Sequence, residues 1–238
     1  MSKITVKQSV GELVAERPGR SRVFEAHGID FCCGGKLPLE EACAKKKVPV
    51  EEVVRQLLEL DQSGSGDDEL IYASMPLDTL ADHIEDTHHE HLRDELPRLQ
   101  RMAERVATVH GEKDERLRQL EDVVHALVAE LMSHMMKEEQ ILFPVIRQMV
   151  QSQASVAMPC GSLSGPINQM EAEHDSAGDA LAAIKTLTDH YTPPEDACNT
   201  YRALFDGLRE LELDMHLHIH KENSILFPKA LALERIYL

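Results

Sequence analysis

The feature that most restricts the fold of this chain is an internal duplication. The segment HMMKEEQILFP begins at His134 and HIHKENSILFP begins at His218, and without gaps they share the first His, the Lys, the Glu after it and the ILFP ending. A second pair precedes them: HEHLRDEL from His89 and HDSAGDAL from His174 each carry His, an acidic residue next and a Leu seven positions later. The His-to-His spacing differs by a single residue between the copies. We infer that a unit of one His-bearing helix and one His-x-x-x-Glu helix has been duplicated.

Apolar residues recur at helical spacing through four long stretches after the first third of the chain. We predict helices over residues 76–109, 114–150, 164–190 and 194–227. Two of the three connections are short, which favours antiparallel neighbours. Aromatic residues are only 4% of the chain and Trp is absent, which suits helical packing better than a β-sandwich or barrel. The predicted fold class is therefore all-α, with an antiparallel four-helix bundle.

A small polar segment, QSGSGDDEL at 62–70, is typical of a linker. We place the linker at 62–75, between a small helical domain at 1–61 and the bundle at 76–238. The first domain contains four short helical patterns: VGELVAE, SRVFEAHG, LEEACAKK and VEEVVRQLLEL. About 60 residues are near the lower limit for independent stability, so this domain could dock on the bundle or form a homodimer.

Each copy of the duplication places a His and a Glu one helical turn apart. His134 with Glu138, and His218 with Glu222, are i,i+4 pairs, so both side chains of a pair lie on one helix face and can reach one ion or two adjacent ions. A carboxylate among Met, Leu and Phe residues is costly to bury unless it is paired. The spacing therefore indicates a metal site.

The alignment of the two copies also selects among neighbouring candidates. Glu139 aligns with an Asn in the second copy, which favours Glu138 as the ligand. His216 and His220 align with methionines in the first copy, which favours His218. Met132, Met135 and Met136 we interpret as core packing, since thioethers fill irregular gaps.

Among the clustered histidines His88, His89 and His91, the Leu register and the helix-to-helix spacing favour His89. A lone His on an apolar helix face is usually an ordinary core or surface residue, but the duplication argues for ligands here. Two carboxylates from opposite helices can bridge two ions, and each ion then receives two imidazoles. Imidazole with carboxylate suits Fe, with Zn and Mn as competitors, whereas structural Zn prefers a closed, often Cys-containing tetrahedral set. The expected ligands are His89, His134, Glu138, His174, His218 and Glu222.

The chain resembles the repair-of-iron-centres proteins, di-iron proteins of nitrosative and oxidative stress within the hemerythrin-like cation-binding family. The resemblance spans about residues 9–230. It is carried by DFCCGGK (30–36), DELP (94–97), SHMMKEEQILFP (133–144), MEAEHD (170–175) and KENSILFP (221–228). It implies two non-haem Fe ions, oxo-bridged when oxidised, held by the same six residues with both glutamates bridging. The loop around Met158–Pro159–Cys160 is longer than the resemblance leads one to expect, and the duplication supports no fifth His of the kind that oxygen-carrying hemerythrins have.

The adjacent thiols of Cys32 and Cys33 form a second candidate site. Adjacent Cys residues rarely chelate one ion, and a vicinal disulfide is strained and easily reduced. Gly34 and Gly35 permit unusual backbone angles, and Lys36 could lower a thiol pKa. We interpret the pair as catalytic in a redox, NO-reactive or iron-transfer sense. The alternative is two buried, apolar Cys side chains.

Composition restricts the partners and the compartment. A formal net charge of −17 would repel a phosphate backbone, so we expect no nucleic-acid partner. The N-terminus has no apolar signal region, and no stretch approaches the roughly 18 apolar residues of a membrane span. Five Cys, two of them adjacent, do not make a secreted disulfide framework, which fits a reducing cytoplasm.

Three functions remain open from the sequence. The resemblance implies a protein that helps to repair damaged iron–sulfur proteins by releasing iron from a labile di-iron site. The second is an enzyme that reduces nitric oxide to nitrous oxide at the diferrous site. The third is a sensor of oxygen or redox state, with NO or O2 as small ligands and the N-terminal domain as the transmitting part.

Overall fold

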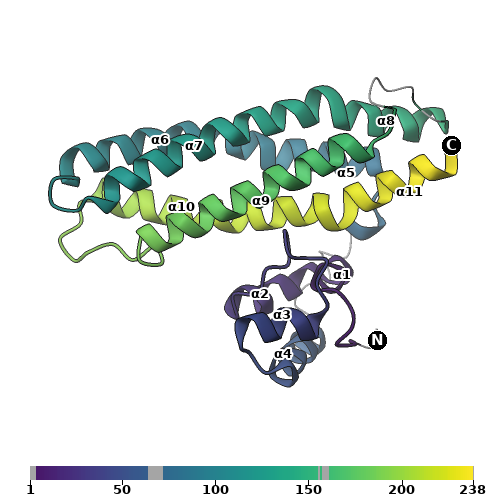
Figure 1. Ribbon diagram of the computed structural model, residues 1–238, viewed down its shortest axis with the longest axis horizontal. Coiled ribbons are helices and arrows are strands. Elements are labelled where there is room, and N and C mark those ends of the chain that lie inside the picture. Colours follow the sequence, from purple (N-terminus) through teal and green to yellow (C-terminus); the bar gives the residue numbers. More distant parts are fainter. Residues whose placement is uncertain (1–3, 64–71, 155, 157–160, 238) are drawn as a thin grey trace. The chain divides into compact units, whose positions relative to one another are not determined.

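The structure is a computed structural model that describes residues 4–63, 72–154, 156 and 161–237 (Figure 1). In these ranges the chain forms helices and no β-strand, with one isolated bridge between Ser9 and Pro38. The predicted all-α fold class is confirmed. None of the helices in the described ranges is both long and apolar enough to cross a lipid bilayer.

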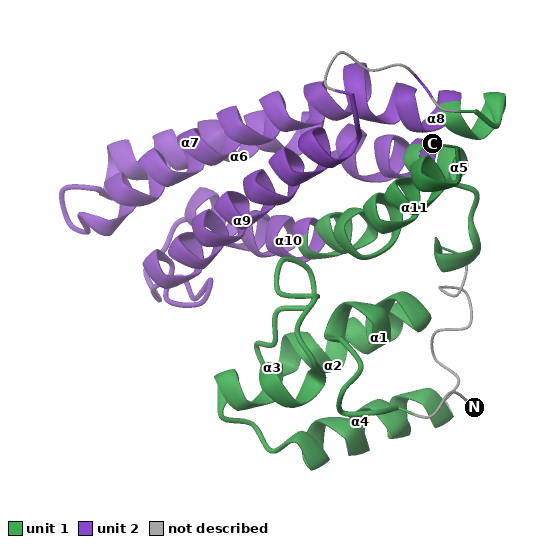
Figure 2. Ribbon diagram, turned by 45° about the vertical axis from the view of Figure 1, so that its right-hand side comes forward, with its two compact units in different colours: residues 1–81, 149–155, 216–238 green, residues 82–148, 156–215 purple. Residues whose placement is uncertain are grey.

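The chain folds into two compact units, which Figure 2 shows in different colours. Each unit is assembled from segments that are far apart in the sequence. Unit 1 comprises residues 1–81, 149–155 and 216–238, and unit 2 comprises residues 82–148 and 156–215. The predicted linker falls largely outside the described residues, as does the segment Met158–Pro159–Cys160.

Unit 2 contains the core of the four-helix bundle. Its helices are α6 (Glu90–His110), α7 (Arg116–Lys137), α9 (Ser164–Leu187) and the part of α10 (Asn199–Lys221) up to Met215. Helix α7 packs between α6 and α9. Helix α10 contacts both α9 and α6. Lys185 of α9 donates to Glu212 of α10 at 3.0 Å, and a Cβ added to Gly207 of α10 would lie 2.7 Å from Leu99 of α6. Four helices therefore surround one core.

Three of the predicted long helices contain a π-helical segment. They are η4 (Glu85–His89) between α5 (Leu77–Ile84) and α6, η5 (Glu138–Leu142) between α7 and α8 (Phe143–Ser152), and η6 (Glu222–Leu226) between α10 and α11 (Phe227–Tyr237). Pro144 and Pro228 follow η5 and η6 by two residues. Proline lacks the N–H for an i→i−4 bond and its ring crowds that carbonyl, and a widened turn relieves both problems. The shared ILFP sequence thus explains two of the three π segments.

The helix bounds depart from the prediction at the end of the third long helix and at both ends of the fourth. The third helix ends at Leu187 rather than at 190, because Asp189, His190 and Tyr191 have φ of 49°, 55° and 60°, in the left-handed region. The fourth begins at Asn199 rather than 194, since the Pro-containing turn uses its own backbone groups, with Ala197 N–H donating to Pro194. It then continues through η6 to Tyr237, ten residues beyond the prediction.

The N-terminal part of unit 1 forms the short helices that the sequence predicts. They are α1 (Val10–Glu16), α2 (Ser21–Ala26), α3 (Leu39–Lys46) and α4 (Val50–Ser63). Ser9 and Glu12 cap α1 with a reciprocal capping box. Arg20 is fully buried and donates to Asp61 at 2.7 Å and to the Leu13 carbonyl at 3.0 Å. This cluster joins α1 to α4.

Within unit 1, the Cys-containing segment packs on the helix line formed by α10, η6 and α11. The Phe31 ring lies 6.0 Å from the ring of His216 and 5.7 Å from that of His220. A Cβ added to Gly11 would lie 2.6 Å from Ser224 Oγ. Positions 216, 220 and 224 are one turn apart, so the Cys-containing segment and α1 contact a single face of this helix line.

Gly34 and Gly35 are needed for close approach rather than for unusual angles. The positive-φ glycines of the described residues are Gly28 and Gly161, so the expectation of special angles at 34 and 35 is wrong. Instead, a Cβ at Gly35 would lie 2.6 Å from the Phe31 carbonyl oxygen, and one at Gly34 would lie 3.0 Å from Asp30 Oδ2. The segment folds back on itself too tightly for a side chain at either position.

We expect Gly35→Ala to destabilise the protein by about 1–3 kcal/mol, because the added methyl meets backbone atoms that cannot move aside cheaply. The midpoint of urea unfolding, followed by circular dichroism, measures this. Gly165→Ala in α9 is the control, since its Cβ meets no neighbouring group within 4 Å and the change should be neutral or stabilising. Equal midpoints for the two variants would contradict the expectation.

Candidate metal centre

Four of the predicted ligands converge within unit 2. His89 ends η4, His134 lies in α7, Glu138 begins η5 and His174 lies in α9. Glu138 Oε2 is 3.4 Å from His89 Nε2 and 3.3 Å from His134 Nε2. His174 Nε2 is 3.0 Å from His134 Nε2. All four residues are at most 2% exposed.

Carboxylates outside this group contact the other ring nitrogen of two of the imidazoles. His89 Nδ1 is 2.7 Å from Glu139 Oε1, and His134 Nδ1 is 2.9 Å from Glu173 Oε2. An imidazole that binds a cation through Nε2 carries its proton on Nδ1, and a carboxylate at Nδ1 is the acceptor that such a ring needs. Imidazole nitrogens gathered around a buried carboxylate are the donor set of a divalent cation, which therefore fits these residues.

Glu173 is held ionised by its other contacts. It accepts hydrogen bonds from Lys137 and from Gln169, in addition to His134. Burial raises the pKa of Glu173, but these hydrogen bonds outweigh burial and lower its pKa to about 2. Sequence reasoning missed Glu173 and treated Glu139 only as a rejected ligand. No local signal could have found either, because the contacts join different helices.

The other two predicted ligands form a pair in unit 1. His218 Nε2 is 3.0 Å from Glu222 Oε1, and both side chains are fully buried. His216 and His220 contact Phe31 instead. Burial, helped by the charge of Lys221, lowers the pKa of His220 to about 4 despite a backbone hydrogen bond with Phe31, so His220 is neutral at pH 7.

The histidines next to His89 have other surroundings. His88 is buried, and its Nδ1 is 2.8 Å from Asp214 Oδ1. His91 is exposed. Within unit 2, His89 is the member of this trio that contacts Glu138.

Cys32 and Cys33 form no disulfide, and their Sγ atoms are 3.9 Å apart. Asp30 organises the segment by accepting from Cys32 N–H at 3.0 Å and from Gly34 N–H at 2.9 Å. The hydrogen bond with Cys33, burial and the negative charge of Asp30 together raise the pKa of Cys32 well above its usual range. The pKa of Cys32 is thus raised overall, whereas the sequence suggested that Lys36 could lower a thiol pKa. The two Sγ atoms and an Asp30 oxygen lie within 4.8 Å of one another.

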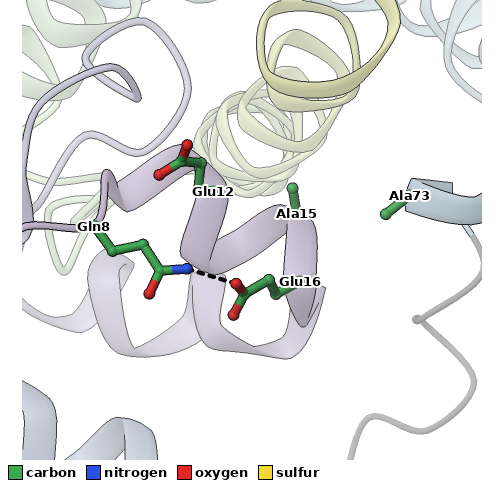
Figure 3. A pocket seen from close by; sticks show the side chains of 5 residues that line it. All are labelled: Gln8, Glu12, Ala15, Glu16 and Ala73. Atoms are coloured by element: carbon green, nitrogen blue, oxygen red, sulfur yellow. Dashed lines mark hydrogen bonds between the residues drawn. The ribbon is translucent and has the colours of Figure 1, made fainter. Parts of the chain in front are cut away.

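Unit 1 also contains an open pocket of about 360 Å³ (Figure 3). Its polar groups already serve the fold: Gln8 donates to Glu16 at 2.5 Å, and Glu12 caps α1. We assign it no role in metal binding. The lining residues are Gln8, Glu12, Ala15, Glu16 and Ala73.

Comparisons with known proteins agree with the geometry. Residues 80–230 match the hemerythrin HHE cation binding domain, and residues 6–61 match ScdA_N, a domain of unknown function (DUF542). The iron-sulfur cluster repair protein YtfE of Yersinia pseudotuberculosis serotype IB (strain PB1/+) is 43% identical, covering 94% of this chain and 96% of the relative. YtfE of Enterobacter sp. (strain 638) is 42% identical, covering 94% and 97%. The chain therefore belongs to the hemerythrin HHE cation-binding domain family and, within it, to the family of the YtfE iron–sulfur cluster repair proteins.

Proposed function

We propose that this chain is a cytoplasmic di-iron protein that helps to repair iron–sulfur clusters damaged by nitrosative or oxidative stress, acting as an iron donor. Damaged iron–sulfur proteins are then its partners. The observation that carries the proposal is the convergence of His89, His134 and His174 on the buried Glu138. The names of the relatives supply the substrate class.

The proposed site holds two Fe ions through all six predicted ligands. His218 and Glu222 are the duplicated counterpart of His134 and Glu138, and the His Nε2 to Glu oxygen distances of the two pairs are similar, 3.0 and 3.3 Å. The site would supply exchangeable ferrous iron with coordination positions left for small molecules. The ligands are His89, His134, Glu138, His174, His218 and Glu222.

The charges of the ligand set favour release of iron. Two ferrous ions carry four positive charges, whereas Glu138 and Glu222 supply two negative ones and the neutral imidazoles none. The carboxylates of Glu139 and Glu173 touch ligand histidines, but each is also paired with a cation, Arg93 or Lys137. The site would thus keep a positive charge, which lowers its affinity for metal relative to a carboxylate-rich set.

Cys32 and Cys33 are proposed to handle electrons or iron for this site. Their segment packs, through Phe31, on the helix line that carries His218 and Glu222. Two thiols next to a carboxylate would also serve as transient ligands for iron in transit. Binding of NO or O2, and a homodimer formed through residues 1–61, stay predictions.

We expect two Fe per chain in protein purified aerobically from iron-replete cells, with oxo-bridge absorption in the near ultraviolet and visible. Elemental analysis with an optical spectrum tests this. Stoichiometric Zn without such a spectrum would show that the site is not a di-iron centre. Recovery of clusters in a defined mixture of damaged proteins, measured beside nitrous oxide yield under anaerobic NO, separates repair from NO reduction.

A further inference from the structure

Two consecutive glutamates hold the two nitrogens of one imidazole. Glu138 Oε2 is 3.4 Å from His89 Nε2, and Glu139 Oε1 is 2.7 Å from His89 Nδ1. Adjacent side chains of a regular α-helix point about 100° apart, so they would not contact both nitrogens of one imidazole ring. They do so here because the π segment η5 begins at Glu138 and widens this turn.

Arg93 completes a chain of contacts that runs from the surface to the ligand. Its guanidinium donates to the same Oε1 atom of Glu139 that contacts His89. Arg93 lies one turn after His89, so both project toward Glu139 from one helix face. The side chains of Arg93 and Glu139 are 42% and 24% exposed, whereas that of His89 is fully buried.

A further contact of His89 limits how its ring can turn. The ring is stacked on Phe143, with centroids 5.8 Å apart and planes 14° apart. Packing therefore fixes the plane of the ring, and the contact of Nδ1 with Glu139 fixes how the ring is turned within that plane.

We infer that the Arg93–Glu139 ion pair positions the His89 ring, and thereby controls how firmly the metal at His89 is retained. The inference rests on the proposed function for the identity of the metal. The duplication adds support, because the position equivalent to Glu139 is the neutral Asn223. The second copy therefore has no carboxylate at the position of Glu139, and the Arg93–Glu139 pair acts on the metal at His89.

The first test titrates the metal-free full-length chain with Zn²⁺ as the probe. Glu139→Gln keeps the shape of the side chain but removes its charge, and should weaken Zn²⁺ binding by roughly 10–100-fold. Unchanged Zn²⁺ affinity in Glu139→Gln would overturn the inference. This readout does not depend on iron, so it stands even if the di-iron proposal fails.

The second test measures release of ferrous iron to a chelator. Loss of an outer carboxylate partner typically weakens metal binding by roughly 10–100-fold, so Glu139→Gln should release one of the two irons faster by a factor of that order. Arg93→Ala should show a smaller acceleration, and Arg93→Lys should restore most of the wild-type rate. Arg116→Ala is the control, because Arg116 pairs with Asp114 on the surface. A wild-type release rate in Glu139→Gln, or equal acceleration in Arg116→Ala, would overturn the role in retention.

Discussion

Glu138→Ala and Glu222→Ala are each expected to yield a chain that retains almost no metal after a chelator wash. In the proposed site each carboxylate contacts both ions and offsets their mutual repulsion, so one substitution affects two metals at once. Histidine ligands, by contrast, each serve one ion. Both glutamates are fully buried beside ligand imidazoles, Glu138 beside His89 and His134 and Glu222 beside His218.

The matched control is Glu139→Ala. Glu139 lies next to Glu138 in the sequence but contacts His89 at Nδ1, the nitrogen that faces away from Glu138. This variant should keep most of its metal and lose it faster on chelation. The measurement is iron and zinc per chain in each variant. Circular dichroism shows whether each variant is folded. Equal loss in all three variants would mean that the alignment of the two copies misidentifies the bridging residue.

Cys32→Ala combined with Cys33→Ala is expected to abolish cluster repair and leave the iron spectrum almost unchanged. The two thiols are outside the proposed ligand set, and the aromatic contact of their segment with the helix line is made by Phe31. The readouts are iron per chain, the optical spectrum and recovery of activity in a damaged iron–sulfur enzyme.

Cys43→Ala provides the comparison for the Cys pair. Cys43 is a buried free thiol of α3, and burial raises its pKa, so it has the properties of a packing residue. Its substitution should leave repair intact. Loss of iron in the double variant would place the thiols in the metal site. Normal repair by the double variant would instead support the alternative that the pair is apolar packing.

The sequence by itself determined the all-helical class, the short helices of the first 63 residues and most bounds of the long ones. These follow from local rules, because apolar periodicity and capping pairs such as Ser9 and Glu12 act within a few residues. The duplication further singled out the candidate ligands, since an i,i+4 pair such as His134 and Glu138 occupies one face of any helix.

Tertiary structure alone decided which residues support the ligands. The contacts of Glu139 with His89 and of Glu173 with His134 join side chains from different helices, and no periodicity encodes them. The same is true of the compact units: residues 216–238 belong with the N-terminal part of the chain, although the sequence pattern assigns them only to the bundle. Helical periodicity says which face of a helix is buried, but the partner that covers this face is chosen by packing between segments distant in the sequence.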